Sequence, residues 1–197
     1  SPRVFANRLA ACDGRANLLP NSSFELGGGD GWSTANMSAS RKVHIFSEAD
    51  HVRDAFHGAY ALRLPGKGVN GMQFSRVFDL PESGTYAFSG YVKASAPDAK
   101  AVKVRLTPIG EGNRFEEDDA RLPHKRPVLG TAVTPTDAWQ RFTVTGPLEA
   151  GLCVLAVNGA CLIDAVQLEK GETASAYAPR AAIEGSLTTD WLGHITY

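Results

Sequence analysis

The stretch Leu162 to Pro179, LIDAVQLEKGETASAYAP, contains the features that decide the fold. Apolar side chains alternate through Leu162, Val166 and Leu168, which is typical of a β-strand with one face in a hydrophobic core. Asp164 lies inside this alternation, and burying a carboxylate without a partner would cost on the order of several kcal/mol. The strand therefore predicts a partner for Asp164 elsewhere in the chain.

Length and charge exclude several classes of protein. The chain has 197 residues, enough for one large domain or one domain with flanking pieces, and a formal net charge of -1. Such a charge gives no field that would attract nucleic acid or an anionic membrane surface. No run approaches the roughly 18 apolar residues of a membrane span. The N-terminus, SPRVF, has neither an initiating Met nor a signal peptide, so we expect the chain to be cut from a longer or processed protein.

The three cysteines, Cys12, Cys153 and Cys161, cannot all pair within the chain. Cys153 and Cys161 flank a predicted turn at 158–159, and a two-residue hairpin there would set Cys161 opposite Ala156 rather than opposite Cys153. We therefore expect buried free thiols, and the alternative is a bridge formed in a different strand register. Cysteine usage leaves the redox compartment open.

Short alternating runs between glycine and proline turns make up most of the chain. Residues 72 to 94 read as two strands joined into a hairpin by a Pro-Glu-Ser-Gly turn. In the run VKVRLT, Val102 and Val104 are expected to point inward and Arg105 outward. No stripe with the helical period is sustained anywhere. About eight to ten short strands of this kind predict an all-β fold, an antiparallel two-sheet β-sandwich.

The predicted sandwich spans residues 17 to 179. Residues 1 to 16 lack a full hydrophobic period and are interpreted as a lead-in from a preceding segment. Residues 180 to 197 start a new apolar pattern and are interpreted as a linker and the start of a following domain. Residues 109 to 128 lose all periodicity and contain an acidic run followed by a basic one. They predict a solvated, self-neutralising loop, and the alternative is a functional docking surface.

An ordered set of short motifs runs through the predicted sandwich. The motifs are NLLPNSSFE, GAYALRL, GTYAFSGYVKA, WQRFTV and IDAVQLEKGx5YAP. Together they resemble the carbohydrate-binding modules of families 4, 9 and 22, which belong to the galactose-binding-like jelly-roll superfamily. The resemblance covers about residues 17 to 179. It implies a jelly-roll sandwich that binds a polysaccharide or oligosaccharide.

The resemblance also implies a structural Ca²⁺ ion between the first strand, the turn before an early strand, and the last strand. Carried over to this sequence, its ligands are the carboxylates of Glu25 and Asp164 and the carbonyls of Ser23 and Ala59. Ca²⁺ takes about six to eight oxygen ligands, so the ion would be the partner that Asp164 needs. The family often has a second acid where this chain has Ala165, which puts the ligand count in question. The alternative is that Asp164 accepts hydrogen bonds without a metal.

Carbohydrate recognition requires flat aromatic faces for the C–H surfaces of pyranose rings and planar polar groups for their hydroxyls. In the resembling modules the cleft crosses the concave sheet. Positions on that sheet or its rim predict these ligand-binding residues: Trp32, Gln73, Tyr91, Arg105, Asn113 and Arg114. Structural roles compete for three of them, because Tyr91 could cap the core, Trp32 could cover the end of the sandwich, and Arg105 could be a solvated charge. Trp139 is interpreted as a structural aromatic at the sandwich edge and is left out.

Catalytic motifs are absent from the sequence. The five histidines show no metal spacing such as HExxH, and there is no GxSxG nucleophile elbow. Acids 116–119 are consecutive in an aperiodic loop, whereas paired catalytic carboxylates sit on separate rigid elements about 5 to 9 Å apart. We therefore predict a non-catalytic carbohydrate-binding module of a larger bacterial-type secreted protein, located in the extracellular space, the periplasm or on the cell surface. Its predicted partners are a glycan and neighbouring domains of the same chain. The alternative is a structural spacer of the same fold that binds no sugar.

Overall fold

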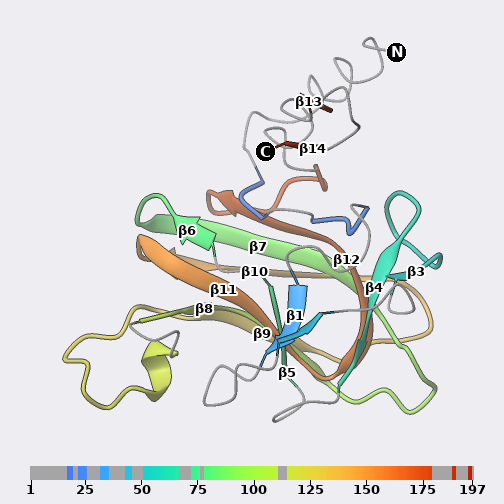
Figure 1. Cartoon of the computed structure of the whole chain (residues 1–197), viewed down its shortest axis with the longest axis horizontal. Helices are drawn as coiled ribbons and strands as arrows, with labels where there is room; N and C mark the ends of the chain where they lie inside the picture. Colours follow the sequence, from blue (N-terminus) through green and yellow to red (C-terminus); the bar gives the residue numbers. More distant parts are fainter. Residues whose placement is uncertain are drawn as a thin grey trace.

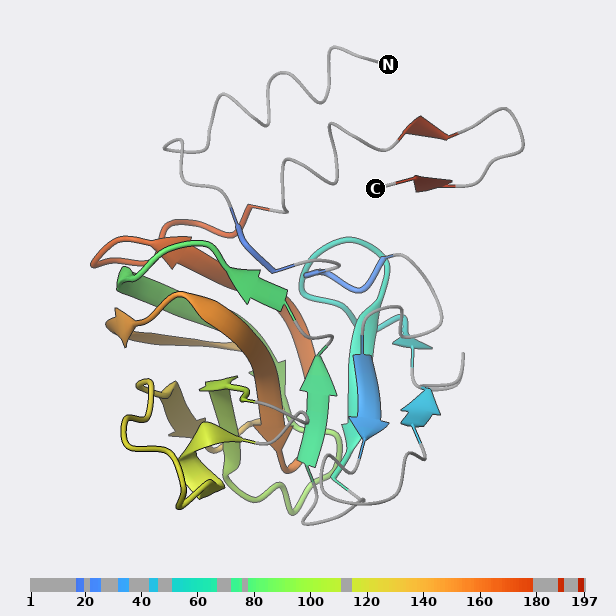
Figure 2. The same ribbon diagram turned by 60° about the vertical axis from the view of Figure 1, so that its left-hand side comes forward.

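The computed structural model is built from two antiparallel sheets. It describes residues 17–19, 22–25, 32–35, 43–45, 51–66, 72–75, 78–110, 115–178, 188–189 and 195–196, with only the backbone of 32–35, 43–45, 72–75, 78, 188–189 and 195–196. Figure 1 shows β7 and β12 in one layer and β8 and β11 in the other, and Figure 2 shows how strongly β11 curves. The predicted all-β, two-sheet antiparallel sandwich is confirmed.

The strands are divided between a seven-stranded and a five-stranded sheet. The seven-stranded sheet has the order β2 (Val43–Ile45), β1 (Trp32–Ala35), β5 (Met72–Ser75), β11 (Gly151–Asn158), β8 (Val102–Pro108) and β9 (Leu129–Val133), with β6 (Phe78–Leu80) also paired to β11. The five-stranded sheet has the order β10 (Gln140–Leu148), β7 (Gly84–Lys93), β12 (Ala160–Lys170), β4 (Ala61–Pro65) and β3 (His51–Val52). A separate two-stranded ladder joins β13 (Thr188–Thr189) and β14 (Ile195–Thr196).

The described helical structure is slight. A 3-10 helix, η4 (Glu116–Asp118), follows β8 in the loop that leads to β9. Within the described residues, no helix has the length and apolar character needed to cross a membrane.

The core lies between the two sheets and is made from the inward residues of both. Val102 and Val104 are fully buried there, as the alternation predicted, and Arg105, the next residue, is partly exposed on the outer face. Phe88 of β7 meets Phe142 of β10 edge to face, with ring centres 5.2 Å apart. Strict alternation of this kind fixes which face of a strand is buried, because a slip of one residue would expose the whole apolar set.

The hairpin predicted around the Pro-Glu-Ser-Gly turn is wrong, whereas the turn predicted at 158–159 is present. The Pro-Glu-Ser-Gly turn joins β6 to β7, and the turn at 158–159 joins β11 to β12, yet in each case the two strands belong to different sheets. Turn residues determine where the chain reverses, but not whether the next strand pairs in the same sheet or crosses to the facing one. Cys153 and Cys161 are buried free thiols, as expected, and burial raises the pKa of Cys161 to about 12. Cys12 lies outside the described residues.

The two ends of the sandwich meet at Asn17. Its buried side chain donates to the carbonyls of Val166 (3.0 Å) and Ala178 (3.3 Å) and accepts the N–H of Leu168 at 3.1 Å. Residues 18–19 are not in a strand, although the N–H of residue 18 donates to the carbonyl of Leu168 at 2.9 Å. The side-chain amide of Asn17 therefore joins the two ends of the sandwich.

Residues 171–178 lie along β12 and are held there by buried side chains. Glu169, which is fully buried, accepts the N–H and the hydroxyl of Ser175 at 2.9 and 2.6 Å. The hydroxyls of Tyr177 and Ser22 are 2.7 Å apart. The predicted boundary at residue 179, the lead-in of residues 1 to 16, and most of residues 180 to 197 lie outside the described residues.

Candidate functional site

Asp164 is fully buried in β12, where the pairing with β7 shifts register. Its Oδ2 accepts the backbone N–H groups of Phe56 and His57, both at 2.8 Å, and its Oδ1 accepts that of Ala165 at 2.6 Å. Burial raises the pKa of Asp164 to about 7, although the three N–H groups act in the opposite direction. The acid therefore ties residues 53–60, here called the 53–60 loop, to the five-stranded sheet.

Glu25 contacts the same loop from the first part of the sandwich. Its carboxylate accepts the N–H of Ala59 at 2.9 Å and the N–H of Tyr60 at 3.0 Å. Gly58 has φ +75°, and a Cβ added there would lie 2.4 Å from Oε1 of Glu25. This position therefore requires glycine both for its backbone and for space. The charge of Glu25 also contributes to raising the pKa of Asp164, so the two carboxylates lie within electrostatic reach of one another.

The predicted calcium ligands are only partly brought together. Glu25 and Asp164 face one loop, but that loop directs N–H groups at both carboxylates, and Ala59 offers Glu25 its N–H rather than a carbonyl. A calcium ion needs oxygen atoms at these places. In the described part of the chain, no cluster of three or more His, Cys, Asp or Glu side chains could hold a metal. The hydrogen-bonded alternative matches the contacts of Asp164, and the ion, with Ser23 as a further ligand, stays a prediction.

The predicted glycan-binding residues do not share one face. Tyr91 lies on β7 of the five-stranded sheet, whereas Arg105 lies on β8 of the seven-stranded sheet. The backbone of Gln73 pairs with that of Val157 in β11 of the seven-stranded sheet, and the role of Gln73 in ligand binding stays a prediction.

Three further members of the predicted site are not described as side chains. Trp32 pairs with Ser75 in the backbone of the seven-stranded sheet, and Asn113 and Arg114 fall outside the described residues. The roles of these three residues stay predictions.

Arg105 lies on the outer face of the seven-stranded sheet beside Phe115. Its guanidinium carbon is 5.5 Å from the centre of the Phe115 ring, and its Nη1 is 2.5 Å from a carboxylate oxygen of Glu117. Two residues along the strand, Thr107 is fully buried, and its Oγ1 has no hydrogen-bond partner among the described atoms. Leaving a buried polar atom unsatisfied costs about 1–3 kcal/mol. This face therefore combines a partly exposed cation, an aromatic ring and an unsatisfied hydroxyl.

Residues 109–128, here called the 109–128 loop, are anchored by a buried ion pair. The carboxylate of Glu116 accepts Nη2, Nε and the backbone N–H of Arg126 at 2.7, 2.9 and 3.1 Å. Arg126 also donates to three backbone carbonyls, those of Ile109, Ala150 and Leu152. The side-chain hydrogen bond to Arg126 lowers the pKa of Glu116, and the same bond raises the pKa of Arg126. A wholly solvated loop was predicted, so the anchor corrects that interpretation.

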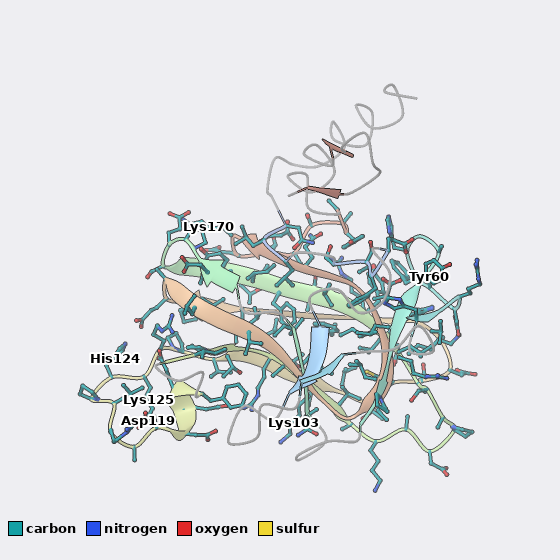
Figure 3. All side chains as sticks on the ribbon, viewed as in Figure 1. Tyr60, Lys103, Asp119, His124, Lys125 and Lys170 are labelled. Carbon is teal, nitrogen blue, oxygen red and sulfur yellow. The ribbon has the colours of Figure 1, made fainter. Side chains whose placement is uncertain are left out.

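The outer part of the 109–128 loop is self-neutralising, as predicted. Arg121 pairs with Asp119 at 2.5 Å, and Lys125 donates to the carbonyl of Glu117 at 2.7 Å. Figure 3 shows Asp119, His124 and Lys125 together at one end of the molecule, with Tyr60 at the opposite end. The 109–128 and 53–60 loops are therefore well separated.

An aromatic cluster that the sequence reasoning missed lies on the outer face of the five-stranded sheet. Phe56 stacks on Tyr91, with ring centres 3.4 Å apart and planes inclined by 12°, and Trp139 meets Phe56 edge-on at 6.5 Å. The guanidinium of Arg141 is 5.9 Å from the Tyr91 ring centre. Tyr91 was among the predicted ligand-binding residues, and Arg141 is an outward position that the alternation of its strand could have indicated. Phe56 comes from a loop, where no periodicity points to it.

The β-sandwich is similar to solved carbohydrate-binding modules. It matches the CBM22-1 xylan-binding domain of Paenibacillus barcinonensis Xyn10C with 18% identity and a TM-score of 0.50, over 83% of this chain and 100% of that domain. It matches the tandem CBM22-1–CBM22-2 of the same protein with 18% identity and a TM-score of 0.51, over 84% of this chain and 49% of that one. The CBM22-1–GH10 modules of Clostridium thermocellum xylanase 10B, complexed with xylohexaose, match with 13% identity and a TM-score of 0.51, over 79% and 29%.

These similarities concern the fold. The chain spans the whole of the single module but about half or less of the two larger proteins. No family model matches the sequence, and no curated protein matches it. The fold that the sequence motifs implied, that of carbohydrate-binding modules, is confirmed.

Proposed function

We propose that this chain is a non-catalytic carbohydrate-binding module of a larger, secreted carbohydrate-active protein. The glycan would lie on the outer face of the seven-stranded sheet, beside Arg105. The observation that carries this proposal is the guanidinium of Arg105 held 5.5 Å from the Phe115 ring on a partly exposed face. The fold supports it, since the chain matches a xylan-binding domain over that domain's full length.

The chemistry of this face suits a sugar. A guanidinium donates several N–H groups in one plane, which matches the paired hydroxyls of a pyranose, and the buried Phe115 ring beside it helps to hold it in position. Asn113 and Arg114 directly precede Phe115 in the sequence and would supply further planar donors at the rim. The carboxylate of Glu117, which pairs with Arg105, would accept hydroxyl protons.

Affinity electrophoresis through gels that contain xylan, mannan, galactan or β-glucan tests this proposal. Xylan is the first polysaccharide to examine, because the similar solved structures include a xylan-binding domain and xylanase modules complexed with xylohexaose. We expect retardation in at least one gel, and a binding loss of about tenfold for Arg105→Ala, on the scale of one or two lost charge-assisted hydrogen bonds. Arg121→Ala is the matched control, because it removes an exposed arginine that is paired with Asp119. If Arg105→Ala and Arg121→Ala are retarded equally, Arg105 is not part of the binding site.

A structural spacer of the same fold is the second candidate function, and one observation favours it. The 109–128 loop already occupies part of the face, since Phe115 and Ile109 form a buried cluster with Val154 and Ala156. A spacer would bind no polysaccharide in any of the gels, and its Arg105→Ala variant would change only stability.

We also propose a structural Ca²⁺ ion between Glu25 and Asp164. Its support is that two carboxylates from the two ends of the sandwich converge on one loop with no cationic side chain among their described hydrogen-bond partners. The contacts that oppose it are the N–H groups of that loop, which would have to yield to carbonyl oxygens. The ion would supply no chemistry beyond holding the chain ends together.

A further inference from the structure

The outer face of the five-stranded sheet carries an aromatic ring that is open to solvent. Phe56 is 43% exposed, and its ring lies flat on Tyr91. The core pair Phe88 and Phe142 shows the ordinary arrangement by contrast, because its rings are almost fully buried and meet edge to face. The stack of Phe56 on Tyr91 is therefore a feature of the surface and not part of the hydrophobic core.

The stack is rigidly supported from below. The backbone N–H of Phe56 donates to Asp164, and Tyr91 is paired in register with Asp164 on one side and Arg141 on the other. Rings held in this way lose little freedom when a ligand binds, which favours binding. The ring face of Phe56 is therefore a fixed platform although it comes from a loop.

Polar groups surround the platform. Nε1 of Trp139 is buried and has no hydrogen-bond partner among the described atoms, while the Trp139 ring lies 6.5 Å from that of Phe56. Lys93 and Asp54 form an ion pair at 2.6 Å, and both side chains are partly exposed. Arg141 closes another side, next to the Tyr91 ring. The rim thus offers donors and acceptors of both signs, and the buried indole N–H of Trp139 lies near enough to report on a ligand at Phe56.

We propose that the cluster of Phe56, Tyr91 and Trp139 is a second carbohydrate-binding surface, which takes a neutral pyranose. The C–H face of the sugar stacks on Phe56, its edge contacts the Trp139 ring, and its hydroxyls bond to Asp54 and Lys93. The cations and acids around the platform balance one another, so no net field selects a charged sugar. The ligand class rests on the proposed function, but the site shares no residue with the face of Arg105.

Indole N–H resonances of the nitrogen-15-labelled protein test this surface. The chain has three tryptophans, so Trp139→Phe assigns the relevant signal. The probes are xylohexaose, cellohexaose, mannohexaose and β-1,4-galactotriose, each added to millimolar concentration. We expect the Trp139 signal to shift with at least one probe, and Phe56→Ala to weaken that binding about tenfold or more. Leu152→Ala is the matched control, because it removes a similarly exposed apolar side chain from β11 of the other sheet.

Each outcome separates the two proposals. A Trp139 shift that survives Arg105→Ala but not Phe56→Ala supports the second surface, whatever happens at Arg105. A Trp139 signal that no probe moves, with binding still lost in Arg105→Ala, overturns the second surface and leaves the proposed function standing. Phe56→Tyr keeps a flat ring, so it should bind as the unchanged protein does. The proposal is overturned if Phe56→Tyr and Phe56→Ala lose binding equally. It is also overturned if Trp139 is covered by a segment of the protein, so that its signal does not respond to sugar.

Discussion

Two loops cover opposite outer faces of the sandwich, and each is held by one buried acid. The 53–60 loop is held by Asp164 of β12, which accepts only backbone N–H groups, and burial raises the pKa of Asp164 to about 7. In the 109–128 loop, Glu116 receives the guanidinium of Arg126, and its pKa is lowered. The two anchors therefore differ in whether the protein supplies a compensating positive charge.

This difference indicates where the molecule is open to regulation by small cations. An acid held by amide dipoles alone keeps its negative charge uncompensated, so a proton or a metal ion gains by approaching it. An acid already paired with a guanidinium gains nothing from a second cation. The proposed calcium ion thus belongs beside Asp164, and the 109–128 loop should be indifferent to metals.

The largest expected effect is the loss of the Asp164 anchor. Asp164→Ala leaves two buried N–H groups of the 53–60 loop, and a third within β12, without an acceptor, so we expect the free energy of unfolding to fall by about 3 kcal/mol. Urea denaturation at pH 7 in EDTA measures it. Asp54→Ala on the same loop is the control, since it breaks an exposed ion pair worth less than about 1 kcal/mol. Similar losses in the two variants would show that Asp164 is no anchor.

The second effect is calcium binding at the same acid. Saturating Ca²⁺ should raise the melting temperature by about 5 °C, because a ligand bound only to the folded state stabilises it, and EDTA should reverse the rise. Differential scanning calorimetry measures the shift. Glu25→Gln should abolish it, whereas Glu116→Gln, in the other loop, should leave it in place. A melting temperature that neither Ca²⁺ nor EDTA changes rules out the ion.

The smallest effect is the response of the 109–128 anchor to acid. The pKa of Glu116 is lowered in the folded protein, so its contribution is complete above the ordinary value of 4.5 and is lost as the pH falls through the folded value. We expect Arg126→Met to cost about 1–2 kcal/mol at pH 7 and less at pH 3. Urea midpoints at the two pH values give the comparison, and a cost that does not change with pH contradicts it.

The sequence predicts the faces of long strands well and the partners of short ones poorly. Val102 and Val104 were placed correctly because β8 alternates from Val102 to Leu106. The hairpin around the Pro-Glu-Ser-Gly turn was wrong because a turn motif does not record which sheet receives the next strand.

The acids of the candidate site were predictable and their partners were not. A carboxylate inside an alternating strand had to be satisfied, and Asp164 is. The groups that satisfy it are backbone amides, which every residue possesses, so no side chain in the sequence marks them. Phe56 was missed for the same reason: its place is set by the hydrogen bond that its backbone N–H donates to Asp164, rather than by a pattern of its own.

The junction at Asn17 bears on how the module responds to tension. Its side chain bonds the carbonyl of Ala178, and Ser22 bonds Tyr177, so the points where the chain enters and leaves the sandwich lie side by side. Force applied through both ends would load these side-chain bonds and the few backbone bonds beside them before it reached the ladders of the two sheets. We therefore expect the module to open from this junction under tension, with the side chain of Asn17 among the first contacts to be loaded.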